Sequence, residues 1–595
     1  KTYGAVGDGV TDDTAAIQAA AVAADGLSLM VPDGTYKLTD AITLTSNTTV
    51  TLSAGVRINQ TGVSKNIFRA VAADNVWVNC NGAVLCGEGT WSSGWTGFSG
   101  HEDRAIQFIN CTNSGIVRPR IKDCGSAGIV IVGGTGIRVI NPRIEGTHAY
   151  STPLAANDNF QAGIYILHGS TYGAADDIQC LDVDISGVAQ GVLIEKEAGV
   201  ATDDTGVRIT GHLHDIPGQH GIYCQAGKMS CDVVVDSTGL AGVKVQSNAS
   251  NTLDLRGFDI RLNATRTGSQ ALELAVPSPG TGFITGVIAR VVADECQRGV
   301  TIDGGVRNAQ IHIVATDTTQ YAALVDGANN ENIDLWVTSD TSGRDGVLIA
   351  ATDSTGIRVR ATVLNPGGET VNTYDGVNIQ TASAEVDLID LDIRDDRWVA
   401  SPDDARMMRY GLFNETAGST VRVLGSLRAT GALTNAVRSA DALLAFPVNA
   451  TLTAGVLDSA LADINDLNAF HDFGALIQSG SQVQYHVQTT TGSAATAWYL
   501  ALSDESAYSV TAEIVGKLAG GAERACFTSN VLTYRNGGSA TIEGTADTIA
   551  TTASASFAGV VAWDVSGNNL RLRLHSGGSV TYDWKLRITV TSLVD

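Results

Sequence analysis

Apolar and polar positions repeat along most of the chain in one four-residue phrase, which reads glycine or alanine, apolar, any residue, apolar. A coil of 20 to 30 residues cannot bury its apolar face alone, so a phrase with this period predicts stacked coils of a parallel β-solenoid. Only the interval after Gly128 exceeds 30 residues, and it measures 35. The phrase appears as AIQF at Ala105, GIVI at Gly128, GIYI at Gly163, GVLI at Gly191, GIYC at Gly221, GVKV at Gly242, ALEL at Ala271, GVTI at Gly299, AALV at Ala322, GVLI at Gly346 and GVNI at Gly376.

A second set of alternating runs lies between the phrases. IVRPRI ends at Ile121 and VINPRI ends at Ile144, 23 residues later. A globular sandwich would place strands every 8–12 residues and would not repeat one phrase, so the solenoid is the better interpretation. Alternation along a strand also predicts which phrase residues point inward. These are Ile129, Ile131, Ile164, Ile166, Val192 and Ile194.

The first residues predict a short helix in this strand-rich chain. YGAVGDGVTDDTAAIQAAAVAA runs from Tyr3 to Ala24, and Thr11, Asp12 and Asp13 can cap a helix that starts near residue 13. A solenoid must cover its open end, where strand edges and core side chains would otherwise be exposed. We therefore expect this helix to lie across the N-terminal end. VPDGTYKL then forms a turn into the first strands.

The same two segments carry a resemblance. YGAVGDGVTDDTAAIQAA followed by VPDGTY resembles the opening motif of the pectate-lyase-like superfamily of right-handed β-helices, in the form found in bacteriophage tailspikes and capsule depolymerases. The resemblance implies a right-handed helix, a homotrimer, and attachment to the virion tail through a segment preceding Lys1. It also implies action at the host cell surface on a capsular polysaccharide or lipopolysaccharide O-antigen. The motif is structural and carries no catalytic residue over.

The C-terminal part follows another pattern. The phrase is lost after about residue 435, and from Gln482 alternating runs succeed one another in an antiparallel style. We predict a cap and opening segment at 1–40, a parallel β-helix at 41–435 and an antiparallel β-sandwich at 436–595. In the resemblance, such a last domain assists trimer assembly or binds sugar. Its tryptophans, Trp498, Trp563 and Trp584, are interpreted as core residues.

Composition narrows the function classes. The net charge of −24 disfavours nucleic acid and anionic membranes as partners, and no apolar run is long enough to cross a bilayer. The nine cysteines show no zinc-ligand spacing and are interpreted as reduced structural thiols. No metal ion or cofactor is expected.

Outward positions of the phrase predict a column of side chains, because equivalent residues of successive coils stack about 4.8 Å apart. Two tyrosines with charged and amide groups would suit a carbohydrate surface, whereas the alternative is an ordinary solvated face. The column contains Tyr165, Leu193, Glu195, Tyr223, Gln225, Lys244, Gln246, Glu273, Thr301, Asp303 and Asp326.

Glycoside hydrolysis needs two carboxyl groups, separated by about 5–5.5 Å for retention or about 6.5–9.5 Å for inversion. Glu195 and Glu197 share one strand face at about 6.5–7 Å, which suits inversion. Asp158, on the long insertion after Gly128, is the other candidate for the second carboxyl group. Glu273 lies three coils from Glu195, about 14 Å away, which is too far for direct pairing. The alternative interpretation of Glu195 and Glu197 is a charged turn at a strand end.

The predicted substrate-binding residues surround this pair. His148 also lies on the insertion, although any single histidine is more often structural than catalytic. The predicted function is depolymerisation of a bacterial surface polysaccharide by hydrolysis, with Glu195, Glu197 and Asp158 as the catalytic candidates. The substrate-binding candidates are Tyr165, His168, His220, Tyr223, Lys244, Gln246 and Glu273.

Two other functions remain open. A polysaccharide lyase would need a base such as Lys244, His220, Tyr223 or Tyr165, and Arg120 and Arg143, stacked by their matching PRI phrases, could bind an acidic polymer. A non-enzymatic adhesin would use the same column and would tolerate the loss of every carboxylate.

Overall fold

The structure of the chain is a computed structural model, and it divides into an N-terminal unit (residues 1–318) and a C-terminal unit (residues 319–595). Each unit is described by itself. The described residues are 2–592 except 63–64, 88–103, 147–161, 170–172, 197–203, 248–253, 278–281, 372, 382, 398–406, 416–417, 433–434, 440–448, 455–480, 490–494, 502–505, 519–523, 536–538, 554–558, 568 and 576–581.

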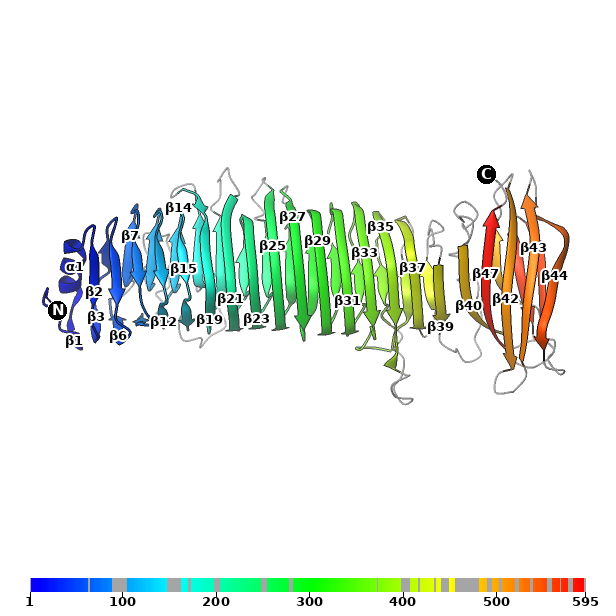
Figure 1. Cartoon of the computed structure of the whole chain (residues 1–595), viewed down its shortest axis with the longest axis horizontal. Helices are drawn as coiled ribbons and strands as arrows, with labels where there is room; N and C mark the ends of the chain where they lie inside the picture. Colours follow the sequence, from blue (N-terminus) through cyan, green and yellow to red (C-terminus); the bar gives the residue numbers. More distant parts are fainter. Residues whose placement is uncertain are drawn as a thin grey trace. The chain divides into compact units, whose positions relative to one another are not determined.

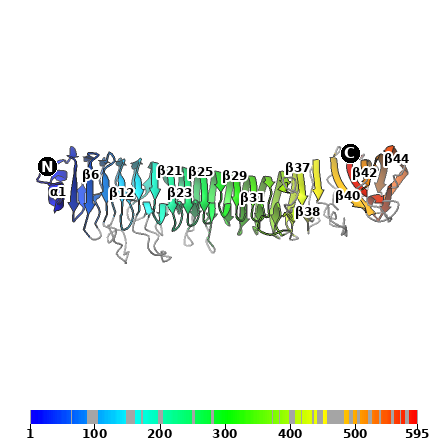
Figure 2. The same cartoon turned by 90° about the horizontal axis from the view of Figure 1, so that it is seen from below.

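The N-terminal unit is a right-handed parallel β-helix, as predicted (Figure 1; turned by 90° in Figure 2). The repeated phrase forms one wall, here called the short-strand sheet, in which each strand pairs in parallel with the strand of the next coil. Its strands in this unit are β4 (Ile42–Leu44), β7 (Phe68–Val71), β10 (Ile106–Ile109), β13 (Ile129–Val132), β17 (Ala162–His168), β20 (Gln190–Lys196), β22 (Ile222–Cys224), β24 (Val243–Gln246), β26 (Gln270–Ala275) and β28 (Arg298–Asp303).

The runs between the phrases form the second wall, here called the long-strand sheet. Early coils contribute two short strands each, and β19 pairs with both β15 and β16 of the preceding coil, so later coils contribute one long strand. The strands in this unit are β1 (Asp8–Asp12), β2 (Ser28–Val31), β3 (Gly34–Leu38), β5 (Thr49–Leu52), β6 (Val56–Gln60), β8 (Trp77–Asn79), β9 (Val84–Cys86), β11 (Gly115–Val117), β12 (Arg120–Lys122), β15 (Arg138–Ile140), β16 (Arg143–Glu145), β19 (Ile178–Ser186), β21 (Asp204–Ile216), β23 (Gly227–Thr238), β25 (Leu255–Thr267), β27 (Ile284–Asp294) and β29 (Val306–Thr318). The strands β14 (Gly134–Thr135) and β18 (Ala175–Asp176) pair in parallel and form a separate two-stranded sheet.

The predicted inward register is confirmed. Ile164 pairs with Ile129 on one side and Val192 on the other, and Ile166 pairs with Ile131 and Ile194. All six side chains are fully buried. Stacking of like aliphatic side chains along the axis therefore builds the core, with each coil burying the face of its neighbour.

Glycine opens the phrase because the next coil passes too close for a side chain. A Cβ atom on Gly191 would lie 2.4 Å from the carbonyl oxygen of Gly221, and one on Gly221 would lie 2.5 Å from that of Gly242. Real Cβ atoms do not approach backbone oxygen so closely, so glycine is required where the chain enters β20 and β22.

The N-terminal helix α1 (Thr14–Ala23) forms as expected at the N-terminal end of the stack (Figure 1). Its N-cap residue is Asp13, but the expectation that this side chain caps the helix is wrong. The Asp13 carboxylate accepts hydrogen bonds from the backbone N–H groups of Val6 (2.6 Å) and Gly7 (3.1 Å) instead. The N–H groups of the opening loop therefore bind this carboxylate in place of the N–H groups of the first helical turn. Asp12 accepts from the Thr14 N–H at 3.0 Å.

The C-terminal unit begins with further parallel coils and ends in antiparallel sheets. Strand β39 still pairs in parallel with β40, whereas β40 pairs antiparallel with β47. The parallel strands are β30 (Ala323–Asp326), β32 (Val347–Ile349), β34 (Val377–Ile379), β36 (Tyr410–Asn414) and β38 (Asn435–Ser439), with β31 (Glu331–Ser342), β33 (Ser354–Leu364), β35 (Ala384–Arg394), β37 (Thr420–Ala432) and β39 (Asn449–Ala454). The remaining strands are β40 (Ser481–Thr489), β41 (Ala495–Ala501), β42 (Ser506–Leu518), β43 (Arg524–Arg535), β44 (Thr541–Ala553), β45 (Val560–Ser566), β46 (Asn569–His575) and β47 (Tyr582–Ser592).

Two antiparallel sheets meet near Trp563. The indole Nε1–H of Trp563 on β45 donates to Ser529 Oγ on β43 at 2.7 Å, and Trp584 on β47 is fully buried. Both tryptophans are therefore core residues, as expected, while the side chain of Trp498 is outside the described set. The domain boundaries at residues 40 and 435 stay predictions, because the division into units at 318 follows compactness alone.

Two sequence inferences about composition also have structural counterparts. None of the nine cysteines forms a disulfide, and all except Cys526 are buried, which agrees with structural thiols. Among the described residues there is no helix long and apolar enough to cross a membrane.

Candidate functional site

Strand pairing brings the predicted column together on the outer face of the short-strand sheet. Tyr165 on β17 is the register partner of Leu193 on β20, which pairs with Tyr223 on β22. Tyr223 in turn pairs with Lys244 on β24, and Lys244 with Glu273 on β26. Within one unit, five successive coils thus present one column of side chains.

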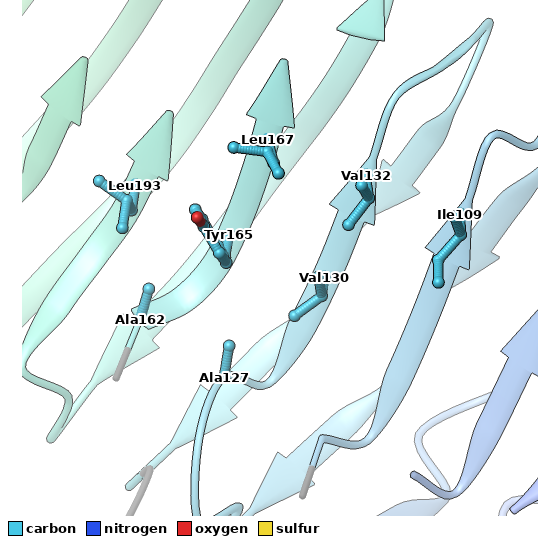
Figure 3. Close-up of a cluster of buried hydrophobic side chains, with 8 residues drawn as sticks. All are labelled: Ile109, Ala127, Val130, Val132, Ala162, Tyr165, Leu167 and Leu193. Carbon is cyan, nitrogen blue, oxygen red and sulfur yellow. The ribbon is translucent and has the colours of Figure 1, made fainter. Parts of the chain in front are cut away.

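Part of this face is apolar and buried, which the interpretation as exposed aromatics did not foresee. Tyr165 is 1% exposed and Leu193 is 2% exposed, so the expectation of solvated tyrosines on consecutive coils is wrong for Tyr165. Figure 3 shows their side chains on neighbouring strands with the other members of the group, here called the outer hydrophobic cluster. The physical reason is that the outward positions of the earlier coils are themselves apolar. The cluster comprises Ile109, Ala127, Val130, Val132, Ala162, Tyr165, Leu167 and Leu193, and Tyr223 packs against it.

Glu195 stands at the polar border of this cluster. It is the register partner of Leu167, and its Oε2 accepts a hydrogen bond from the phenol of Tyr165. Burial raises the pKa of the Glu195 carboxyl above its ordinary value, and the Tyr165 hydroxyl opposes that shift. A carboxyl group with a raised pKa retains its proton closer to neutral pH, as a general acid requires.

Tyr223 belongs to a neutral polar network. Its hydroxyl accepts from Gln225 Nε2 at 2.7 Å and donates to Gln246 Oε1 at 3.1 Å. Burial, assisted by the charges of Glu195 and Glu273, raises the pKa of Tyr223 to about 12. The phenol therefore stays protonated, and the network offers hydroxyl and amide groups that suit sugar hydroxyls.

Lys244 and Glu273 form an ion pair on adjacent coils. Lys244 Nζ lies 2.9 Å from Glu273 Oε1, and the two side chains are 18% and 14% exposed. The lysine charge is thus already engaged, although the pair remains at the same face as Tyr223. Thr301, the next residue of the column, is buried, and Asp303 and Asp326 are exposed.

His168 and His220 both accept hydrogen bonds from backbone N–H groups. His168 Nδ1 accepts the Ala175 N–H, and His220 Nδ1 accepts the Ala241 N–H, both at 3.1 Å. Burial, with the nearby charge of Lys244, lowers the pKa of His220 to about 3, so the ring is neutral. Since Nδ1 is an acceptor, the single ring proton of His220 resides on Nε2.

Five sequence candidates remain. Glu197, Asp158 and His148 lie outside the described residues, so their roles stay predictions. Arg120 and Arg143 are register partners, as their matching phrases predicted, but they belong to the long-strand sheet and share the carboxylate of Glu145.

Two residues on or directly after the strands that form this face were missing from the predicted site. Gln225 binds the Tyr223 hydroxyl, and it was in the predicted column without being assigned a role. Lys196 is buried and is the register partner of His168. Its place could have been found by aligning ILH after Tyr165 with IEK after Leu193, since the two coils match residue for residue.

The fold and this face define a parallel β-helix that carries a column of acidic, phenolic and amide groups on one wall. A comparison with protein families finds one match, at residues 1–55, to the family described as rhamnogalacturonase A/epimerase, pectate lyase-like. This match agrees with the resemblance of the opening motif and covers only that segment. A search of the curated proteins finds no match.

Solved structures give low-identity similarities. The tailspike protein of Escherichia coli bacteriophage HK620 in complex with a pentasaccharide shares 10% identity, covering 99% of this chain and 91% of that chain, with a TM-score of 0.45. The Streptococcus pneumoniae surface protein and adhesin PfbA shares 14% identity, covering 65% and 98%, with a TM-score of 0.41. The A-module of the Azotobacter vinelandii mannuronan C-5 epimerase AlgE4 shares 14% identity, covering 66% and 95%, with a TM-score of 0.34. At these scores the similarities carry no functional argument.

Proposed function

We propose that this chain binds and depolymerises a bacterial capsular polysaccharide or O-antigen by hydrolysis, as a tailspike of a bacteriophage virion. The observation that carries the proposal is Glu195, a carboxyl group with a raised pKa at the edge of a wall of polar side chains. In this role Glu195 protonates the leaving glycosidic oxygen.

The neighbouring residues fit substrate positioning. Tyr223 with Gln225 and Gln246 would hydrogen-bond sugar hydroxyls, and the Tyr223 ring, packed against the outer hydrophobic cluster, would contact a sugar face. Lys244 would exchange its bond to Glu273 for an acidic group or hydroxyl of the polymer. Tyr165 would position the carboxyl of Glu195.

The second carboxyl group is proposed to come from Glu197 or Asp158. Glu273 is three coils from Glu195, about 14 Å at the spacing of parallel strands, which exceeds the separation in either hydrolytic mechanism. Glu197 follows Glu195 by two residues, and that spacing favours inversion.

The rival lyase reaction is less well supported by the side chains of this face. It needs a base, but His220 Nδ1 is occupied by a backbone N–H and its other nitrogen carries the proton. Tyr223 has a pKa raised to about 12, and Lys244 is paired with Glu273. Each of the three side chains is therefore already engaged by a neighbour or protonated, which does not favour the lyase reaction.

The test is the mass of the oligosaccharides released from candidate capsules and O-antigens. Products that gain one water per cleavage support hydrolysis, whereas unsaturated uronates would establish the lyase reaction. Binding without release, unchanged in Glu195→Gln, would establish an adhesin. Glu385→Gln, an exposed glutamate of the long-strand sheet, is the matched control.

The proposed tailspike is a homotrimer that is attached to the virion tail and acts outside the host cell. Light scattering tests the assembly. A mass near three times 61.7 kDa supports it, and a monomer of 61.7 kDa would contradict it.

A further inference from the structure

A second cluster of chemically active side chains lies on the long-strand sheet, away from the strands that carry Glu195. It consists of Asp184 on β19 with His212 and His214 on β21. One potential ligand atom from each residue lies within 4.8 Å of the others. Among the described residues this is the group of histidine, cysteine and carboxylate side chains that is arranged to hold a metal ion.

The parallel register explains why the three side chains converge. His212 and His214 are two residues apart, so they share one face of their strand. Asp184 is the register partner of His212 on the neighbouring strand. The two imidazoles stack with centroids 4.6 Å apart, and His214 Nε2 lies 3.1 Å from Asp184 Oδ1.

Asp215 completes the arrangement behind His214. Its Oδ2 lies 3.0 Å from His214 Nδ1, the nitrogen that does not face Asp184. A histidine that ligates a metal usually donates its other ring N–H to such a carboxylate, which fixes the ring and increases its basicity. The carboxylates of Asp184 and Asp215 thus lie on either side of the His214 ring, and their negative charge favours a cation at this cluster.

We propose that Asp184, His212 and His214 bind a divalent transition-metal ion, with Zn²⁺ as the best match. Two imidazole nitrogens and one carboxylate oxygen are ligands that Zn²⁺ prefers, and three protein ligands leave a position for water. Bonds of about 2.0–2.1 Å in a tetrahedron require ligand atoms about 3.4 Å apart. Rotation of the exposed His212 side chain would provide this closure, while Asp215 holds the His214 ring.

One neighbouring charge opposes the metal. Arg143 Nε lies 3.8 Å from Asp184 Oδ2, the carboxylate oxygen that does not face His214. The guanidinium thus competes for the same carboxylate and lowers its attraction for a cation. Removing this charge provides a gain-of-affinity test that a merely structural cluster would not pass.

The test uses the full chain and two probes, ZnCl₂ in isothermal titration and CoCl₂ in visible absorption. We expect one ion per chain at this site, with a cobalt d–d spectrum of low-coordinate geometry that His212→Ala/His214→Ala abolishes. Asp215→Asn should weaken zinc binding about 10–100-fold by removing the outer carboxylate. Arg143→Gln should strengthen it. His312→Ala, an exposed histidine on β29 of the same sheet, is the control and should change nothing.

Two outcomes would overturn the proposal. One is equal zinc affinity in the wild type and in the double histidine variant, which would locate any binding elsewhere in the chain. The other is the absence of zinc binding to wild-type protein that circular dichroism shows to be folded, together with a melting temperature that zinc does not change. Release of oligosaccharide does not enter either criterion, so the result is independent of the function proposed above.

Discussion

Two carboxyl groups, one in each unit, have the same direction of pKa shift but very different surroundings: Glu195 is half-buried and Asp375 is fully buried. Glu195 is desolvated beside the outer hydrophobic cluster, and its shift is opposed by the hydroxyl of Tyr165. Asp375, which precedes β34, is desolvated too, but Arg409 binds both of its oxygens at 3.0 and 2.7 Å and the Tyr410 N–H adds a third bond. Burial raises both pKa values, yet the lone pairs of Asp375 are already used.

The difference shows that a raised pKa does not by itself identify a functional acid. Asp375 closes a turn between coils, and its cation and backbone partners account for its burial. Among the residues that the structure describes, Glu195 is bonded to the Tyr165 phenol and to no cation, and the proposed function would account for its position. The bonding partners of a carboxyl group therefore distinguish a proposed catalytic acid from a structural carboxylate, and each of the following variants tests that distinction.

The largest effect is expected from Glu195→Gln. The amide keeps the size of the side chain but cannot protonate a leaving oxygen, so the rate of oligosaccharide release should fall about 10²–10⁴-fold while binding persists. The melting temperature should stay close to that of the wild type. Initial rates by reducing-end assay and a thermal scan measure both. Normal turnover would remove Glu195 from the mechanism.

Asp375→Ala, in contrast, should lower stability rather than the rate of oligosaccharide release. It leaves the partly buried guanidinium of Arg409 and the Tyr410 N–H without their acceptor, and the loss should be about 3 kcal/mol of unfolding free energy. The comparison variant is Arg422→Ala, which breaks an exposed pair with Asp387 and should cost less than about 1 kcal/mol. Denaturant midpoints measure the difference. Equal losses would show that Asp375 contributes no more than a surface pair does.

A pH-dependent change in stability is expected from Asp345. Burial, together with the charge of Asp375, raises the pKa of Asp345 to about 7 from 3.8. The Asp345 carboxyl therefore loses its proton at a lower pH in the unfolded chain than in the folded chain. Its contribution to stability is therefore favourable below about pH 4 and is lost progressively as the pH rises to about 7. Asp345→Asn retains an acceptor for the Asp375 N–H and should flatten this dependence. Melting temperatures from pH 4 to 8 test it, and identical curves would contradict the assignment.

The smallest effect is expected from Tyr165→Phe. Removing the hydroxyl takes away the bond that lowers the pKa of Glu195, so that pKa should rise further. A general acid loses activity as the pH passes its pKa, and the alkaline limb of the rate profile should move to higher pH. Tyr534→Phe, on β43 of the C-terminal unit, is the control and should leave the limb in place. A shift toward acid pH would refute the sign.

The fold could be predicted from the sequence to a large extent because one phrase, repeated at nearly constant period, specifies strand pairing. Ile164 and Val192 stack as their spacing requires, and the helix after Asp13 forms. The side-chain environment was harder to predict. Tyr165 was expected in solvent, but the neighbouring outward positions Val130 and Leu167 bury it.

The chemical site depended on contacts that spacing does not encode. The alternation correctly placed Tyr223 and Lys244 in one column. It could not predict that His220 Nδ1 accepts a hydrogen bond from a backbone N–H group. No metal site was predicted, because His212 and His214 lie in no local pattern of ligand residues. Asp184, the third residue of the proposed metal site, is 28 residues upstream of His212 and meets it only through the coil register.

The nearly constant coil makes the N-terminal unit resemble a one-dimensional lattice, in which each layer interacts only with the layers before and after it. Inserting or deleting a complete coil preserves the phase of all later layers, whereas a change of a few residues shifts every later side chain out of line. New surface chemistry can therefore arise by duplication or exchange of whole layers. In such a lattice, the length and composition of the wall that carries Glu195 can evolve without redesign of the interior that supports it.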